Sequence, residues 1–448
     1  MSMKLFSKEF SPSVYNKQSG DQSSNRYCKF DSQIVMFFTS SVYLAASLSS
    51  LFASKITRKY GHQPTIALGG ALYVFGSITS AGAAAQNIFK LIVGRILLGF
   101  GVGFTNQSVS LYLSEMAPCK IPGHMLFQLF VTLGIFLANC INSFSTDLKN
   151  YGQCWRCSLG LAAVPGLIVL LGGIFLPETP KSLIERNHPV KAKQLLKKMR
   201  GVDNVDEEYN DLVAANKASK KVKDSWRRLL YDTKYQPQLT FAIAVPLFQQ
   251  FTGTYGVMLY APVLLNSLGF GSSFSLMSAR VIGCINAVAT VVSTFVASDR
   301  SSRRKLFMEG GIQMIISQCA IGGLIWYKFG WSTCVGTLSR SFYPFILLAS
   351  ISCNVVGFAY SWSLFGPLLP SEICSPEVQS AAHSLYVSLD MFWAFVISQV
   401  FLVLFCRLKY LLFFGFAFLT LVTTIFIYSY LPETKGVPKI SKPEEKKL

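Results

Sequence analysis

Leu176-Pro177-Glu178-Thr179 returns in the second half of the chain as Leu431-Pro432-Glu433-Thr434. Ser114-Glu115-Met116-Ala117-Pro118 has a looser counterpart in Ser371-Glu372-Ile373-Cys374-Ser375-Pro376, at almost the same spacing. Two motifs that recur at one long spacing indicate that the chain consists of two similar halves in tandem. A fold of two repeated halves is therefore the first expectation.

The composition excludes an ordinary water-soluble protein. The 448 residues are 51% hydrophobic and only 14% charged, whereas a soluble domain carries about 25% charged residues. Most of the net charge of +19 lies in loops between apolar segments. Such placement orients membrane helices and argues against nucleic acid as a partner. Duplication in so apolar a chain predicts a membrane transporter.

Eleven apolar runs are long enough to cross a bilayer, which takes about 20 residues. They lie near 34–53, 65–84, 91–113, 126–144, 159–176, 239–268, 274–297, 306–327, 342–369, 381–405 and 410–430. The counterpart of 239–268 would fall at or before the first residues, where no apolar run occurs. We therefore expect an all-α membrane protein of about 11 transmembrane helices, with an N-terminal half that lacks its first helix.

Lys and Arg orient the chain and divide it into parts. Basic loops at 55–61 and 299–305, the stretch after the fifth run and the tail are predicted to face the cytoplasm. The N-terminus then lies outside, although its segment carries five Lys and Arg, which also favours a lost helix. The expected parts are an external segment (1–33), an N-terminal bundle (34–176), a cytoplasmic helical linker (177–237), a C-terminal six-helix bundle (238–431) and a cytoplasmic tail (432–448).

The linker is charged and predicted to be helical. Pro189 suits the first turn of a helix, with a basic amphipathic segment behind it and an acidic one from Asp206. A solvated connector is the simplest interpretation, and a regulatory or lipid-contacting role is the alternative.

A few amide and ionisable side chains lie within the apolar runs, where they are costly and normally face a cavity or a partner. Gln249 and Gln250 are adjacent, just before Gly253, which lets a helix bend or break. Two neighbouring amides suit the hydroxyl groups of a sugar. Helix–helix contact is the alternative role for any one of them. The other residues expected at the same cavity are Gln128, Asn286 and Asp390.

Arg95 lies in another apolar run and is a candidate for ion coupling, with a structural arginine near a helix end as the alternative. No nucleotide-binding or metalloprotease motif occurs, and the four histidines are scattered along the sequence. Cysteines within apolar runs are small hydrophobes. The sequence therefore predicts no enzyme activity, no metal and no cofactor.

The segment Gly94–Pro118, with Gly-Arg-Ile-Leu-Leu-Gly-Phe-Gly at its start and Ser-Glu-Met-Ala-Pro at its end, carries a family resemblance. It resembles the plant monosaccharide/proton symporters, in the sugar-porter branch of the major facilitator superfamily. The resemblance extends from about Phe10 to Val437. Further matches are Pro177–Pro180, Gln249-Gln250, Tyr260–Pro262, Asp299-Arg300, Arg303-Arg304, Pro370–Ile373 and Pro432–Gly436.

The resemblance implies two helical bundles, a central hexose site and proton-driven uptake across the plasma membrane, with hexose, proton and lipid bilayer as partners. By position, Arg95 matches an arginine that pairs with an aspartate of the first helix to couple protons. Cys28 and Cys406 match an external disulfide. The matching sugar-site positions are Gln128, Gln249, Gln250, Asn286 and Asp390. The matching gating residues are Glu115, Glu178, Asp299, Arg300, Arg303, Arg304, Glu372 and Glu433.

Several positions depart from the family's pattern. Tyr255 and Pro367 stand where the family has asparagine and tryptophan, and Asp390 places a carboxylate, itself able to bind a proton, where the family has asparagine. Arginines of the cytoplasmic motifs are replaced by His62, Gln63, Pro122 and Gln379. Together these changes predict weak or absent proton-coupled uptake. The alternatives to a working symporter are therefore a transport-impaired or sugar-sensing protein and a non-functional product of a shortened gene.

Overall fold

A computed structural model describes residues 33–82, 88–117, 123–147, 154–201, 204–220, 225–268, 272–299, 303–330, 342–367, 374–375 and 377–430. Within these ranges every regular element is a helix. Helices are expected for apolar runs of this length, because a spanning segment in lipid must satisfy its backbone hydrogen bonds internally. The all-α fold predicted from the sequence is confirmed.

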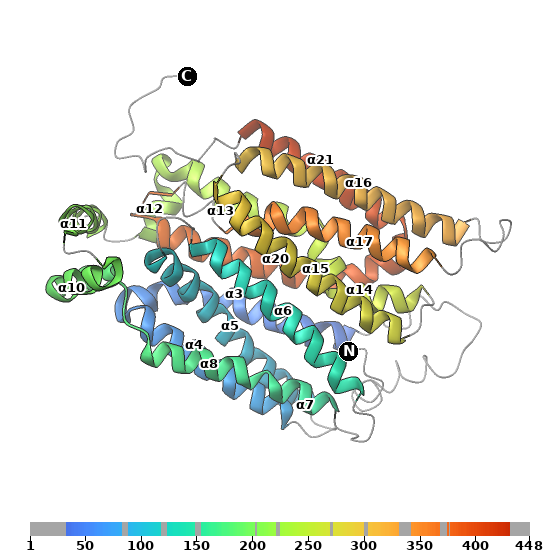
Figure 1. Ribbon diagram of the computed structural model, residues 1–448, viewed down its shortest axis with the longest axis horizontal. Coiled ribbons are helices and arrows are strands. Elements are labelled where there is room, and N and C mark those ends of the chain that lie inside the picture. Colours follow the sequence, from blue (N-terminus) through green and yellow to red (C-terminus); the bar gives the residue numbers. More distant parts are fainter. Residues whose placement is uncertain are drawn as a thin grey trace.

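The first half contributes one bundle of helices, drawn in blue to teal in Figure 1. Its members pack in the pairs α3 with α5, α4 with α5, α4 with α8 and α5 with α6. The bounds are α3 (Gln33–Tyr60), α4 (His62–Ala81), α5 (Ile88–Met116), α6 (Gly123–Asp147), α7 (Cys154–Leu161) and α8 (Ala163–Phe175).

The second half forms the other bundle, from yellow to red in Figure 1. In it α16 packs against both α17 and α21, α15 packs against α17, and α13 packs against α20. The bounds are α13 (Gln236–Phe251), α14 (Thr254–Ser267), α15 (Ser272–Asp299), α16 (Arg303–Gly330), α17 (Tyr343–Tyr360), α18 (Trp362–Phe365), α20 (Gln379–Leu408) and α21 (Leu411–Tyr430).

The segment between the halves lies at one end of both bundles, which we call the linker end (Figure 1). It holds α9 (Pro180–Glu185), α10 (Pro189–Arg200), α11 (Asp206–Lys220), α12 (Ser225–Tyr231) and a short 3₁₀ turn, Thr233–Tyr235. The sequence predicts that this end faces the cytoplasm. Pro189 is in the first turn of α10, as predicted.

All eleven predicted spans contain helix. Nine helices of the described ranges are long and apolar enough to cross a membrane. The predicted span 239–268 is divided between α13 and α14, each shorter than a bilayer crossing. The predicted span 306–327 lies in the 28-residue α16, which carries more polar residues. The two additional spans are therefore one broken helix and one less apolar helix.

The two halves meet where α3 packs against α20 and α6 packs against α15. Small polar side chains line the first contact: the Ser384 hydroxyl donates to the Ser50 carbonyl at 2.6 Å and the Ser388 hydroxyl to the Ser47 carbonyl at 2.9 Å. Large apolar side chains such as Phe75, Phe130 and Phe418 are exposed on the outside of the bundles. Polar contacts inside and apolar side chains outside are what a lipid solvent favours.

Candidate functional site

The break between α13 and α14 positions the two predicted amides. Gly253 has φ 71°, a backbone conformation that favours glycine, and an added Cβ would lie 2.5 Å from the ring of Phe416. Gln318 of α16 donates its side-chain amide to the freed carbonyl of Thr252 at 2.6 Å. Gln249 and Gln250 form the last turn before this break, and both are buried.

Gln249 and Gln250 each bind a side chain of α20. The Tyr386 hydroxyl donates to Oε1 of Gln249 at 2.7 Å, and Nε2 of Gln250 donates to Oδ1 of Asp390 at 2.8 Å. Tyr386 and Asp390 are four residues apart, so they lie on the same face of α20. We call Gln249, Gln250, Tyr386 and Asp390 the amide cluster.

Gln128 joins this region from the first half. Its Nε2 donates to Oγ of Ser363 in α18 at 2.7 Å. The same short helix ends at Gly366, where an added Cβ would lie 2.5 Å from Oε1 of Gln249. Side chains of both halves therefore meet around α18.

Several buried polar atoms near the break have no hydrogen-bond partner within the described ranges. They include Oε1 of Gln250, Nε1 of Trp362 next to Ser363, and Nδ2 of Asn354. The side-chain oxygen of Asn354 accepts from Thr254, the first residue of α14, at 2.9 Å. Buried polar groups are normally paired, so these donors and acceptors are suited to a polyhydroxyl ligand.

No described hydrogen bond joins the Asn286 side chain to another residue of the site. It lies on α15, is 3% exposed, and its Oδ1 has no partner within the described ranges. α15 packs against α6, the helix of Gln128. Asn286 therefore lies in the interior on a helix that borders the site, without a bond to the amide cluster.

Arg95 lies inside the first bundle. Its guanidinium is 4.3 Å from the centre of the Phe38 ring, and Nε has no partner within the described ranges. No described carboxylate forms an ion pair with it. Arg95 is on α5 of the first half and Asp390 is on α20 of the second, and no described contact joins the two side chains.

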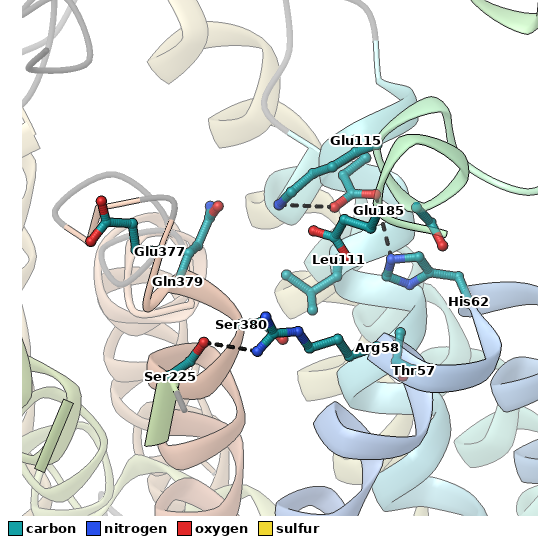
Figure 2. Close-up of a pocket in the computed structure, with 12 residues that line it drawn as sticks. Thr57, Arg58, His62, Leu111, Glu115, Glu185, Ser225, Glu377, Gln379 and Ser380 are labelled. Carbon is teal, nitrogen blue, oxygen red and sulfur yellow. Dashed lines mark hydrogen bonds and ion pairs between the residues drawn. The ribbon is translucent and has the colours of Figure 1, made fainter. Parts of the chain in front are cut away.

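Glu115 is the centre of a polar network at the linker end (Figure 2). It lies 3.3 Å from Nζ of Lys181 and 3.4 Å from Nε2 of His62, and it accepts from the Thr179 hydroxyl at 2.6 Å. Burial disfavours the charged form of Lys181, but the Glu115 carboxylate outweighs this and raises the pKa of Lys181. Burial raises the pKa of Glu185, which borders the same cleft.

The other gating residues fall into three groups. Glu178 forms an ion pair with Arg186 at 2.8 Å and accepts the backbone N–H of His62 at 2.9 Å. Arg304 lies 4.5 Å from the ring centre of Tyr428 and donates to its carbonyl. Asp299 ends α15 and Arg303 begins α16.

The predicted residues that lie outside the described ranges are Arg300, Glu372, Glu433 and Cys28. Cys406 is in the last turn of α20, so the disulfide stays a prediction.

Two members of this region, Tyr386 and Ser363, were not predicted from the sequence. Tyr386 has a signal in the sequence, because it precedes Asp390 by one helical turn in an apolar run. Ser363 has none, because only the packing of α18 against α6 shows that it binds Gln128.

Comparison with known proteins agrees with this architecture. The family described as "Sugar (and other) transporter" matches residues 1–444. The chain is 50% identical to Sugar carrier protein C of Ricinus communis and 49% identical to Sugar transport protein 1 of Arabidopsis thaliana. Each match covers 98% of this chain and 83% of the relative.

In fold, the chain is similar to the proton:xylose symporter XylE of E. coli, solved with 6-bromo-6-deoxy-D-glucose. The TM-score is 0.80 at 20% identity, over 97% of this chain and 94% of that one. This likeness shows the fold of the major facilitator superfamily. With a family match along nearly its whole length and relatives at about half identity, the chain is a multi-pass membrane protein that belongs to the family of sugar (and other) transporters.

Proposed function

We propose that this protein carries a hexose together with a proton across the plasma membrane, by alternating access of its two halves to a central site. The observation that carries the proposal is the meeting of both halves at a helix break. Gln128 of the first half binds Ser363, while Gln249 and Gln250 of the second half bind the same face of α20. The names of the relatives, a sugar carrier and a sugar transport protein, support the substrate class.

Amide side chains suit the substrate because each offers donors and an acceptor. A hexose hydroxyl needs both, and a bound sugar would pair with the buried amide atoms that lack partners. Gln128, Gln249, Gln250 and Asn286 are the proposed ligands, with Asp390 as the carboxylate beside them.

We assign the proton to Asp390 and the balancing charge to Arg95. Asp390 lies in the middle of α20, accepts one amide hydrogen bond and forms no ion pair with any described cation. A carboxylate in such a place is costly when charged, so it is suited to gain and lose a proton. Because Gln250 bridges Asp390 to the sugar site, protonation and sugar binding would influence each other.

A second candidate function is a sugar-binding protein whose proton-coupled transport is impaired. Arg95 favours it, because no described carboxylate pairs with this partly buried cation. In that case the site would retain sugar affinity without driving uptake.

The test is uptake of labelled glucose, galactose and xylose by hexose-transporter-deficient yeast that expresses this chain, with and without a protonophore. The proposal predicts saturable hexose uptake that a protonophore suppresses. Binding of hexose by the purified chain without uptake would establish the second candidate, and neither binding nor uptake would overturn both.

A further inference from the structure

The fold brings together two of the four histidines that are scattered in the sequence. His124 lies at the start of α6 in the first half and His383 lies on α20 in the second. Their ring centres are 5.2 Å apart. Nδ1 of His124 and Nε2 of His383 lie 2.7 Å and 3.2 Å from Oγ of Ser110 on α5. Nδ1 of His383 lies 2.8 Å from Oε1 of Gln107.

All four side chains are buried, with at most 2% of each residue exposed. We call Gln107, Ser110, His124 and His383 the histidine bridge. It crosses the contact between the two halves near the linker end, beside the cleft of Figure 2, whose lining includes Leu111 and Ser380. Leu111 follows Ser110 directly, and Ser380 precedes His383 by about one helical turn. The bridge therefore lies within about one helical turn of the cleft along both α5 and α20.

Neutral imidazoles satisfy these hydrogen bonds in a single direction. Oε1 of Gln107 is an acceptor, so Nδ1 of His383 donates to it. Nε2 of His383 then accepts the Ser110 hydroxyl, and Ser110 Oγ accepts the N–H of His124 Nδ1. In the neutral bridge, His124 therefore donates to Ser110, Ser110 donates to His383, and His383 donates to Gln107, so the hydrogen bonds run from the first half to the second and return to the first.

Added protons disturb this arrangement. With one proton, His383 donates to both Gln107 and Ser110, so both rings now direct an N–H at the one Ser110 oxygen, and a positive charge is buried where no described carboxylate contacts His383. With two protons, two positive charges also face each other across the contact between α6 and α20. When the halves separate, water can solvate both rings.

The other titratable groups at this end have partners of their own. Glu115 is held by His62 and Lys181, Glu377 accepts from the Tyr235 hydroxyl, and Arg58 donates to Ser225. The charged or titratable groups on the elements around the bridge include Lys55, Arg58, Lys59, His62, Arg95, Glu115, Lys181, Glu185, Arg227, Arg228, Glu377 and Asp390.

We propose that the histidine bridge is a proton-binding site that holds the linker ends of the two halves together when it is neutral and releases them when it is protonated. A site that binds protons more tightly in the separated state must favour separation as the pH falls. The site is distinct from the amide cluster and would act whether or not sugar transport is coupled to protons.

The experiment is a distance measurement between the halves in the full chain, reconstituted in lipid nanodiscs. Ketone-bearing amino acids at Lys59, the exposed end of α3, and at Gln236, the exposed start of α13, carry spin labels without involving the native cysteines. Distances are compared between about pH 8 and about pH 5.5, a range in which histidine titrates. We expect the ratio of short to long distances to fall at least about fivefold in the parent chain.

His383→Gln and His124→Gln, tested separately, should each reduce this change to less than about twofold, because glutamine keeps hydrogen bonding but does not titrate. If His383→Gln does not show the parental distances at the higher pH, its structure is altered and the test relies on His124→Gln alone. His188→Gln, at the exposed residue just before α10, should retain the parental response. An unchanged distance in the parent, or a full response in both bridge variants, overturns the proposal.

Discussion

At the scale of single residues, Gln250 has two roles in the amide cluster. Its Nε2 holds Asp390 at 2.8 Å, and its Oε1 is buried without a partner within the described ranges. One side chain therefore connects the proposed proton site to the proposed sugar site. Substitution of Gln250 should therefore affect sugar binding most, and substitution of Asp390 should affect the pH dependence of uptake most.

Gln250→Ala should weaken hexose binding by about tenfold to a hundredfold, because a buried hydrogen-bond partner of the sugar is lost. Equilibrium binding of labelled glucose to the purified chain measures this. Gln313→Ala is the matched control, since its amide bonds the Cys353 carbonyl between α16 and α17, away from the cluster. Equal affinity in the Gln250→Ala variant and the parent would remove Gln250 from the site.

Asp390→Asn should keep hexose binding within about threefold of the parent, because the neutral amide still accepts from Gln250. It should abolish the dependence of uptake on external pH. In the parent, uptake should rise as external pH falls, because sugar is carried with the protonated carboxyl group. Initial uptake rates from about pH 5 to pH 8 measure the difference. A variant with the parental pH profile would place the proton elsewhere.

At the scale of elements, the broken helix α13/α14 builds the site. Gly253 has a positive φ and lies against Phe416, and Gln318 binds the carbonyl of Thr252 that the break leaves unpaired. The sequence indicated the break through Gly253 in an otherwise apolar run. It did not indicate what holds the break, because Phe416 and Gln318 come from distant helices. Periodicity predicts helices, whereas their contacts depend on packing.

Gly253→Ala should destabilise the protein by about 1–3 kcal/mol, because the new Cβ meets both an unfavourable φ and the Phe416 ring. Thermal unfolding in detergent and hexose binding are the measurements. Gly323→Ala in α16 is the control, because nothing lies within 4 Å of an added Cβ there. If the two variants are equally stable, the turn at Gly253 is not as constrained as the structure indicates.

At the scale of the whole molecule, the proposed functions depend on two regions where the halves meet. The amide cluster and Gln128 bring the halves together in the interior, and the histidine bridge joins them near the linker end. The repeated motifs and the eleven apolar runs were enough to predict two bundles of helices. The partners of Gln249, Gln250 and His383 were not predictable, because they depend on which faces of α13, α5 and α20 meet.

Counterflow tests the central claim most directly. The purified full chain is placed in liposomes loaded with unlabelled glucose, and entry of labelled glucose is followed over time. If the amide cluster binds the carried sugar, the parent and Gln313→Ala should accumulate label transiently, and the double variant Gln249→Ala/Gln250→Ala should accumulate none. Label that never exceeds the level in protein-free liposomes, or accumulation that is undiminished in the double variant, would contradict it.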